Sequence, residues 1–340
     1  MKKENQPSKS SRREFLQKTA VGVSAMALGA DIIAKTTPWQ QTGIPTRPLG
    51  STGENVSIIC LGGFHIGSVA KQDEKEAIKM MHTAIGEGVT FFDNSWDYHD
   101  GGSEEIMGKA LAIDGMRKKA FLMTKNCDRD YAGSMKKLED SLRRLKTDYV
   151  DLWQFHEIIY DNDPDWVFDK GGIKAAIEAQ KAGKVRFIGF TGHKDPAIHL
   201  KMLNKEFDWD TAQMPINVMD AHYRSFQHGV VPECISQKVG VIGMKALGGG
   251  AMVQQAGLTA EECRRYALSQ PISSLVCGMG SVKDMEQDIA IARNFKPMSS
   301  GEKYELEARV KDVAGDGRYE LFKSAKNYDG GYHRKQHGFS

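Results

Sequence analysis

Four chemically distinct side chains follow apolar, strand-like segments of the chain. Asp93 and Tyr98 lie in FFDNSWDYHDG, residues 91–101, while Lys125 ends AFLMTK and His156 ends DLWQFH. Reduction of a carbonyl needs a proton donor for the oxygen and a polar contact that stabilises the developing alkoxide. These residue types could supply both, provided that three successive strands deliver them to one place.

Tyr98 is the predicted proton donor. A free phenol has a pKa of roughly 10 and is a poor acid near neutrality. We expect the positive charge of Lys125 to lower the pKa of Tyr98, and Asp93 to pair with Lys125 and fix its position. His156 is expected to donate a hydrogen bond to the substrate oxygen. Each residue alone could be a helix cap, a solvated cation or a packing residue, but their joint occurrence at successive strand ends favours catalysis.

Eight short apolar segments, each followed by a longer amphipathic stretch, would position these side chains. Their ends are separated by about 24 to 36 residues, the length of a strand, a helix and two loops. Several are apolar on both faces, which indicates a parallel sheet covered by helices. The predicted strands are residues 56–61, 90–93, 120–124, 149–155, 185–191, 211–215, 239–244 and 274–277.

The segments between the strands have helical periodicity. Apolar residues at spacings of three and four predict a helix that begins after Gly133–Ser134 and ends at Thr147. A similar stripe predicts a helix over residues 78–85, ended by Gly86 and Gly88. Eight such units favour a closed (β/α)8 TIM barrel over a doubly wound open sheet. The open sheet would normally carry G-x-G-x-x-G after its first strand, and LGGFHIGS lacks that spacing.

Composition and charge place the chain among ordinary globular proteins. It has 340 residues, of which 40% are hydrophobic and 26% charged, and its formal net charge is +2. This small charge gives no reason to expect a nucleic-acid partner.

The first 34 residues resemble a twin-arginine signal peptide. Arg12 and Arg13 precede a mildly apolar stretch, residues 20–34, which is too short and too rich in Gly and Ala for a membrane span. We therefore expect the twin-arginine export machinery as a partner, a mature chain that begins near Lys35, and a periplasmic or other extracytoplasmic location reached in the folded state. If the signal is not used, the protein stays in the cytoplasm.

Five cysteines are scattered along the chain, at positions 60, 127, 234, 263 and 277. There is no CxxC, so the spacing supports neither an iron–sulfur cluster nor structural zinc, and no metal site is expected. Cys60 and Cys277 fall in apolar strand-like runs and are expected to be buried.

From about residue 44 to residue 300 the chain resembles the aldo-keto reductase family. The resemblance rests on RPLGSTGENVSIICLGGFHIG, FFDNSWDY, LMTK, DLWQFHE, GKVRFIGFTGH and GVIGMKALGGG. It implies a (β/α)8 barrel with a nicotinamide cofactor across its mouth, and oxidation or reduction of a small aldehyde, ketone or alcohol. It also implies the catalytic roles given above to Tyr98, Lys125, Asp93 and His156.

The resemblance further implies where the nicotinamide half of the cofactor binds. Gly63 and Phe64 match a loop beside the ring, and Gln213 matches the residue that binds the carboxamide. Met244 stands where many members have a stacked aromatic ring. Where the family usually carries a Ser–Asn pair, this chain has Thr191, Gly192 and His193.

The rest of the cofactor would extend along the last two strand ends. The residues expected to follow the pyrophosphate are Lys245, Ala246, Leu247 and Gly248. Ser281 and Lys283 could meet a 2′-phosphate and Gln287 fits the adenine-contacting position, but Asp284 would repel a phosphate. NADP is therefore the expected cofactor, with NAD as the alternative.

Residues 301–340 are expected to form a C-terminal helix and tail. The tail either folds over the barrel mouth and shapes substrate choice, or wraps the outer surface or contacts another subunit. Trp96 is a candidate for the substrate pocket. The alternative to an enzyme is a redox-sensing subunit that binds nicotinamide without turnover.

Overall fold

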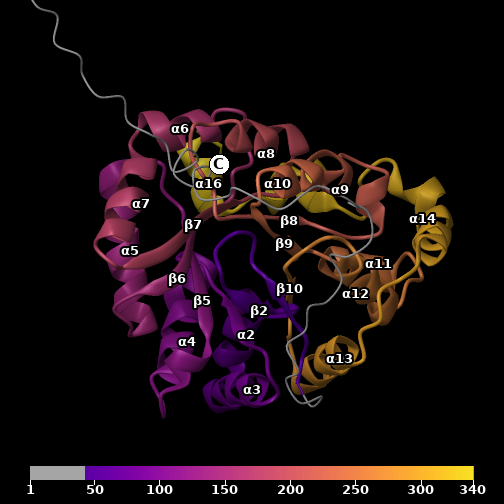
Figure 1. Ribbon diagram of the computed structural model, residues 1–340, viewed down its shortest axis with the longest axis horizontal. Helices are drawn as coiled ribbons and strands as arrows, with labels where there is room; N and C mark the ends of the chain where they lie inside the picture. Colours follow the sequence, from indigo (N-terminus) through magenta and orange to yellow (C-terminus); the bar gives the residue numbers. More distant parts are fainter. Residues whose placement is uncertain (1–42, 340) are drawn as a thin grey trace, which may run out of the picture. The chain divides into compact units, whose positions relative to one another are not determined.

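A closed barrel of eight parallel strands forms the centre of the protein (Figure 1). The computed structural model describes residues 43–339, so the predicted signal peptide, residues 1–34, lies outside them. Consecutive strands pair with one another, and the last pairs with the first, which confirms the predicted (β/α)8 barrel. The strands are β3 (Ile59–Gly62), β4 (Phe91–Asp93), β5 (Phe121–Asn126), β6 (Val150–Phe155), β7 (Val185–Thr191), β8 (Thr211–Pro215), β9 (Gly240–Met244) and β10 (Ser274–Cys277).

Three strands, β7, β8 and β10, have the bounds that the sequence predicted. The prediction of a single first strand over residues 56–61 was wrong. The run 56–61 serves two sheets: β2 (Asn55–Ser57) pairs antiparallel with β1 (Thr46–Pro48), and β3 joins the barrel. Ser57 marks the division, because its hydroxyl donates to the carbonyl of Ile59 and accepts from the backbone amide of Thr90. At this point the Ser57 side chain makes the hydrogen bonds that backbone groups of a neighbouring strand would otherwise make.

Helices surround the barrel, and most strands are followed by at least one of them (Figure 1). Their bounds are α2 (Gly63–Gln72), α3 (Glu74–Gly86), α4 (Gly102–Leu111), α5 (Tyr131–Leu145), α6 (Asp163–Asp169), α7 (Gly172–Lys181), α8 (Pro196–Leu203), α9 (Phe226–Gly229), α10 (Val231–Ser236), α11 (Ala251–Gln254), α12 (Ala260–Leu268), α13 (Val282–Arg293), α14 (Ser300–Ala314), α15 (Leu321–Ser324) and α16 (Gly331–Gln336).

Two helices test the periodicity directly. Helix α3 ends at Gly86, as predicted. Helix α5 begins at Tyr131, several residues before the predicted start. Its first turn, YAGS, lacks the apolar stripe that predicted the rest of the helix, but the side chain of Asp130 accepts a hydrogen bond from the amide of Gly133 at 2.8 Å and caps the helix earlier.

The strands alternate between two apolar cores, as the two-residue period of a strand requires. Phe91 and Met123 belong to the core inside the barrel, and Phe92 and Leu122 to the core between the barrel and its helices. Leu49, which lies between β1 and β2, also belongs to the inner core, so the β1–β2 hairpin covers the end of the barrel where the strands begin. Polar side chains can reach the interior only at the opposite rim.

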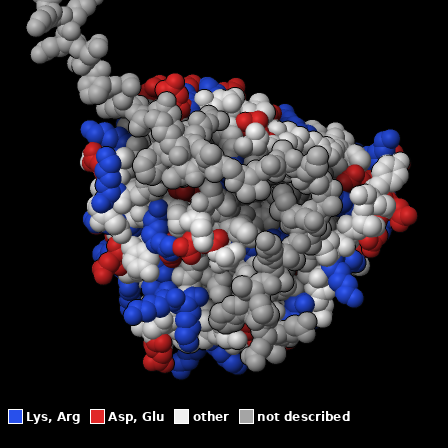
Figure 2. Space-filling view, in the orientation of Figure 1, with Lys and Arg blue, Asp and Glu red and all other residues white. Residues whose placement is uncertain are grey.

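All five cysteines are buried and free, which confirms the prediction for Cys60 and Cys277. Among residues 43–339, no helix is long and apolar enough to cross a membrane. Acidic and basic side chains are interspersed over the visible described surface, with several Lys and Arg side chains gathered at the lower left, over α4 (Figure 2).

After α14 the chain returns to the barrel. Helix α14 packs through Leu306 and Val310 on a core that includes Tyr266. The segment then reaches the ends of the central strands: the ring of His193 lies 2.8 Å from the carbonyl of Phe322, and His337 stacks on Trp166 of α6 at 4.5 Å. Figure 1 shows α16 beside α6 and α8.

We predict that Gly108→Ala destabilises the protein by about 1–3 kcal/mol in urea unfolding. Alanine normally stabilises a helix interior by about 1 kcal/mol relative to glycine. Here, however, a Cβ atom would lie 2.1 Å from the carbonyl oxygen of Arg144 in α5, so the two helices would have to separate.

Gly301→Ala in α14 is the matched control. A Cβ atom at that position meets only Ser299 Oγ, at 3.9 Å, so this variant should be neutral or slightly stabilising. Equal unfolding free energies for the two variants would contradict the close contact between α4 and α5.

Candidate active site

A buried ion pair between Lys125 and Asp93 lies at the rim where the strands end. Lys125 Nζ contacts the Asp93 carboxylate, donates to the carbonyl of Asn94 at 2.7 Å and lies 3.3 Å from the Tyr98 hydroxyl. The two charged side chains are 1% and 4% exposed. All three ammonium donors of Lys125 therefore have a partner, and three of the predicted catalytic residues are brought together.

Strand register explains this meeting. Asp93 pairs with Met123 across β4 and β5, and Met123 points into the barrel. Lys125 is two residues further along β5, so its side chain points to the same interior. The sequence suggested that the strand ends at residue 124, just before Lys125. In the structure β5 continues to Asn126, so Lys125 lies within the strand.

The loop between β4 and Tyr98 is held by hydrogen bonds to its neighbours. The side-chain amide of Asn94 donates to the carbonyl of Ser103 at 2.9 Å, and Arg144 donates to the carbonyl of Trp96 at 2.9 Å. His99, directly after Tyr98, has a φ of 53°, a left-handed conformation that is uncommon outside glycine. It is partly buried, and its Nε2 lies 2.7 Å from the carbonyl of Phe64, so His99 joins this loop to the residues that follow β3.

His156 follows β6 and is anchored through its backbone. Its amide donates to the carbonyl of Asn126 at 2.8 Å, and Arg129 donates to its carbonyl at 2.8 Å. Its Nδ1 lies 3.2 Å from Asp97 Oδ1 and 3.5 Å from Cys127 Sγ. Within residues 43–339 its Nε2 has no hydrogen-bond partner, and its ring centroid is 5.6 Å from that of Tyr98.

Burial raises the pKa of Tyr98 well above its usual value, and the negative charges of Asp93, Asp97 and Glu157 raise it further. The expectation that Lys125 lowers the pKa of Tyr98 was therefore wrong. The physical reason is that Asp93 neutralises the charge of Lys125, which leaves the cost of burying a phenolate. The site thus keeps the Tyr98 hydroxyl protonated near neutral pH.

The carboxylates nearby respond differently to burial. Burial raises the pKa of Asp93, although Lys125 opposes the shift. Burial also opposes the ionisation of Asp97, but the interaction with His156 and the hydrogen bond from Ser95 hold the pKa of Asp97 well below its usual range. A carboxylate therefore stands beside the His156 ring throughout the neutral range.

The ends of β8 and β9 present unpaired polar groups where the nicotinamide carboxamide and the pyrophosphate were expected. Among residues 43–339, Gln213 Oε1 is buried without a hydrogen-bond partner, and Gln213 Nε2 meets only Met244 Sδ, at 3.6 Å. The side-chain ammonium of Lys245 makes no hydrogen bond or ion pair within the described chain, and burial lowers its pKa. Gly248 has a φ of 59°, and a Cβ atom there would lie 2.8 Å from the carbonyl of Tyr319. These groups fit an amide and an anionic ligand.

The residues after β3 lie in a helix. Gly63 and Phe64 form the first turn of α2, which starts directly after the strand, so the expected loop is absent there. Phe64 is 48% exposed, and its ring packs edge-on against Tyr98 at 5.5 Å. An exposed phenylalanine beside the proton donor could cover a planar ligand.

Three further candidates lie at and just beyond the end of β7. Thr191 and Gly192 are buried there, while His193 places Nε2 3.6 Å from Glu157 and Nδ1 2.8 Å from the carbonyl of Phe322, so it faces the C-terminal segment. Ala246 is buried and Leu247 partly buried.

The expected adenosine end is exposed. Ser281 caps α13 by accepting from the amide of Asp284 at 3.1 Å. Lys283 and Gln287 follow on the surface of the same helix. The structure thus brings Asp284 to the same helix end as the candidate phosphate-binding residues.

Trp96 lines a cavity of about 470 Å³ beside Asp97. The Lys137 ammonium lies 4.5 Å from the Trp96 ring centroid, and the Tyr332 ring lies 5.6 Å away. The cavity is lined by Trp96, Asp97, Asp100, Arg144, Gly331, Tyr332 and Lys335. The C-terminal segment therefore supplies one wall of a cavity at the catalytic rim.

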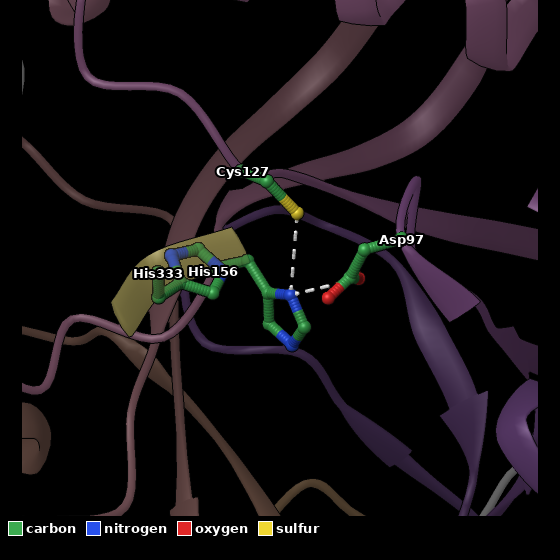
Figure 3. A group of neighbouring side chains, drawn as sticks. All are labelled: Asp97, Cys127, His156 and His333. Atoms are coloured by element: carbon green, nitrogen blue, oxygen red, sulfur yellow. Dashed lines mark hydrogen bonds and ion pairs between the residues drawn. The ribbon is translucent and has the colours of Figure 1, made fainter. Parts of the chain in front are cut away.

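Four residues from distant parts of the chain gather at His156, and sequence reasoning missed the group (Figure 3). Asp97, Cys127 and His333 each offer a polar atom, and these atoms and one ring nitrogen of His156 all lie within 4.8 Å of one another. No short motif connects them, because they come from three rim loops and from α16. Only knowledge of where the tail docks could have placed His333 there.

Comparisons with known proteins identify the family to which this barrel belongs. The model of the aldo/keto reductase family matches residues 58–270. L-galactose dehydrogenase from Arabidopsis thaliana is 26% identical over 317 residues, which cover 80% of this chain and 96% of that protein. Aldo-keto reductase YhdN from Bacillus subtilis (strain 168) is 30% identical over 207 residues, covering 56% of this chain and 58% of its own.

Solved structures show the same fold at lower identity. Aldo-keto reductase AKR11C1 from Bacillus halodurans (holo form) superposes with a TM-score of 0.67 at 22% identity, covering 78% of this chain and 96% of that one. An aldo-keto reductase from Klebsiella pneumoniae in complex with NADPH gives a TM-score of 0.66 at 20% identity, with coverages of 78% and 95%.

The parallel barrel with polar groups at its C-terminal rim has the architecture of a TIM-barrel enzyme, in which active sites lie at that rim. The chain belongs to the aldo/keto reductase family, whose members are NAD(P)-dependent oxidoreductases.

We predict that protonation of His199, which hydrogen-bonds to the backbone of Gln213, lowers the free energy of unfolding in acid. Its Nε2 donates to the carbonyl of Gln213 at 3.1 Å, and burial lowers its pKa to about 4. Its pKa in the unfolded chain is roughly 6.5. Between these values the unfolded state binds more protons, so this contribution to stability is complete above the unfolded pKa and is lost as the pH falls towards 4.

His199→Gln keeps a donor for Gln213 but does not titrate. Between about pH 7.5 and pH 5, the free energy of unfolding should fall by about 2 kcal/mol more in the natural protein than in the variant. Urea unfolding at both pH values measures this difference. Parallel losses in the two proteins would contradict a buried, neutral His199.

Proposed function

We propose that the protein reduces an aldehyde or ketone to an alcohol, or catalyses the reverse reaction, with Tyr98 as general acid or base. The observation that carries the proposal is the position of Lys125 Nζ, which contacts both the Asp93 carboxylate and, at 3.3 Å, the Tyr98 hydroxyl. The alternative, a redox-sensing subunit without turnover, would not require this proton-donor arrangement.

In the direction of reduction, Tyr98 donates its proton to the carbonyl oxygen. The raised pKa of Tyr98 keeps the proton in place until the oxygen gains negative charge. Lys125, fixed by Asp93 and Asn94, then stabilises the phenolate that remains, at a distance of one hydrogen bond.

His156 orients the carbonyl oxygen through Nε2, which has no protein partner in the described part of the chain. His156 Nδ1 lies 3.0 Å from the Ser95 hydroxyl, 3.2 Å from Asp97 Oδ1 and 3.5 Å from Cys127 Sγ. Nε2 is a donor if the ring is an imidazolium whose Nδ1 donates to Asp97, or if the Ser95 hydroxyl or the Cys127 thiol donates to Nδ1 of a neutral ring. Burial raises the pKa of Cys127 well above its usual value, so the thiol keeps the proton that it would donate.

A nicotinamide cofactor would supply the hydride. Gln213 Oε1 can accept a hydrogen bond from its carboxamide, and Lys245 with the Gly248 turn can hold its pyrophosphate. NADPH is favoured, since structures of similar fold from Klebsiella pneumoniae are described in complex with NADPH and NADP. Asp284, which stands one residue from Lys283, supports NADH as the second choice.

We predict that Tyr98→Phe lowers kcat for reduction of a panel of small aldehydes and ketones by about 10²–10⁴-fold, because the oxygen loses its proton donor. Oxidation of NADPH measures turnover, and fluorescence titration with NADPH measures binding, which the variant should retain.

Tyr131→Phe is the control for this experiment. It removes an exposed hydroxyl that donates to Glu178 at 2.6 Å and makes no contact with Tyr98, Lys125 or His156, so this variant should turn over normally. Equal rates for Tyr98→Phe and the natural protein would remove the acid/base role. Cofactor binding without turnover of any carbonyl would support the redox-sensing subunit.

We also propose that the chain is exported by the twin-arginine route, on the basis of Arg12–Arg13 and the apolar residues 20–34. Export of a folded chain would allow the cofactor to bind before transport. In a bacterial host with this route, the natural chain should fractionate with the periplasm, while Arg12→Lys combined with Arg13→Lys should remain in the cytoplasm. The same distribution for both chains would overturn the proposal.

A further inference from the structure

The side chains around His156 have the composition of a transition-metal site. They comprise a carboxylate, a thiol and two imidazoles, contributed by Asp97, Cys127, His156 and His333. Figure 3 shows Cys127 and Asp97 directed at Nδ1 of His156, while His333, carried by α16, lies beside the His156 ring. This group faces the side of the imidazole that does not serve the carbonyl in the proposed reaction.

The distances between the ligand atoms suit a four-coordinate ion. Zinc bonds of about 2.0–2.3 Å in a tetrahedron place the ligand atoms roughly 3.3–3.7 Å apart. His156 Nδ1 lies 3.2 Å from Asp97 Oδ1 and 3.5 Å from Cys127 Sγ. The largest separation in the group is within 4.8 Å, so small rotations of the outer side chains would complete the tetrahedron.

A second observation points to a missing ligand. His333 is fully buried, and within the part of the chain that the structure describes its Nε2 has no hydrogen-bond partner. An unpaired ring nitrogen in a buried site is costly. Its ring centroid lies 5.4 Å from that of His156, so the unsatisfied imidazole belongs to the same group.

We propose that Asp97, Cys127, His156 and His333 bind one Zn²⁺ ion at the catalytic rim. Zinc is favoured because a mixed set of thiolate, imidazole and carboxylate ligands matches its borderline softness and its preference for four ligands. The thiol proton is released on binding, so the ion is held by one thiolate and one carboxylate, which balance its charge.

The charged groups around this site are compatible with a cation. The Ser95 hydroxyl donates to Asp97 at 2.6 Å and would orient that ligand. The negative charge of Glu157 acts on His333. The Arg129 guanidinium lies 3.5 Å from His333 Nδ1, but it is paired with Asp163 at 2.8 Å, which reduces its repulsion of an ion.

Zinc at this position has two structural consequences. It binds α16 to the ends of β5 and β6, so the C-terminal segment becomes fixed at the catalytic rim. It also occupies His156 Nδ1, so the proton of a neutral ring must reside on Nε2. The second consequence rests on the proposed function, because Nε2 is there the donor to the carbonyl, but metal binding itself does not depend on turnover.

The test measures metal binding to the full chain after treatment with a chelator and removal of the chelator. Equilibrium dialysis with Zn²⁺ should give one ion per chain. Substitution with Co²⁺ should give a thiolate-to-cobalt charge-transfer band and the visible bands of a tetrahedral ion. Both readouts are independent of reductase activity, so they separate this proposal from the proposed function.

Cys127→Ser and His333→Ala should each weaken Zn²⁺ binding by more than about tenfold, because the loss of even an outer hydrogen-bond partner of a metal ligand typically costs roughly 10–100-fold. Cys127→Ser should also remove the charge-transfer band. The matched controls are Cys263→Ser, a buried thiol in α12, and His337→Ala, a histidine that pairs with Asp163 in the same tail.

Circular dichroism checks that each variant folds. If His333→Ala does not fold, the near-isosteric Cys127→Ser decides the test. Stoichiometric binding that both ligand variants lose and both controls retain supports the site. Absence of stoichiometric binding, equal binding in folded Cys127→Ser, or a Co²⁺ complex without a thiolate band would overturn it.

Discussion

The buried ion pair between Lys125 and Asp93 is the interaction on which the catalytic rim depends. Removal of one partner from such a pair leaves an uncompensated charge and typically costs about 3–5 kcal/mol. Here the pair also joins two neighbouring strands and places an ammonium 3.3 Å from the Tyr98 hydroxyl. The Lys125 ammonium also donates a hydrogen bond to the carbonyl of Asn94. It therefore fixes the first residue of the loop that carries Tyr98. One side chain therefore determines both the position of the phenol and the charge beside it.

The barrel and this rim could be predicted because strand periodicity is local and the strands are consecutive. The positions of Asp93 and Lys125 at the ends of two successive strands were enough to predict that they meet at one rim, and the register of β4 and β5 shows why they do. The split of the first strand could not be read from its apolar residues, since it depends on the hydroxyl of Ser57 pairing with the chain near Thr90. Such side-chain contacts with the backbone leave no periodic signal.

Predictions about the site failed where they needed burial or distant contacts. The pKa of Tyr98 rises because desolvation and the surrounding acids outweigh a lysine that is already paired, and burial cannot be assigned from residue type alone. His333 joins His156 only because the tail docks on the rim, which no spacing reveals. Gln213 and Lys245, the candidate cofactor-binding residues of β8 and β9, were predicted only in part. The family resemblance named the two residues, but only the structure shows that their side-chain polar groups lack partners in the described chain.

The docking of α16 at the rim also joins segments that are far apart in the sequence. His333 and Tyr332 contact the side chains of His156 and Trp96, which follow strands in the first half of the barrel. A change in α16 can therefore reach these two side chains without altering any strand, so the catalytic end of the molecule can vary while the barrel that supports it stays the same.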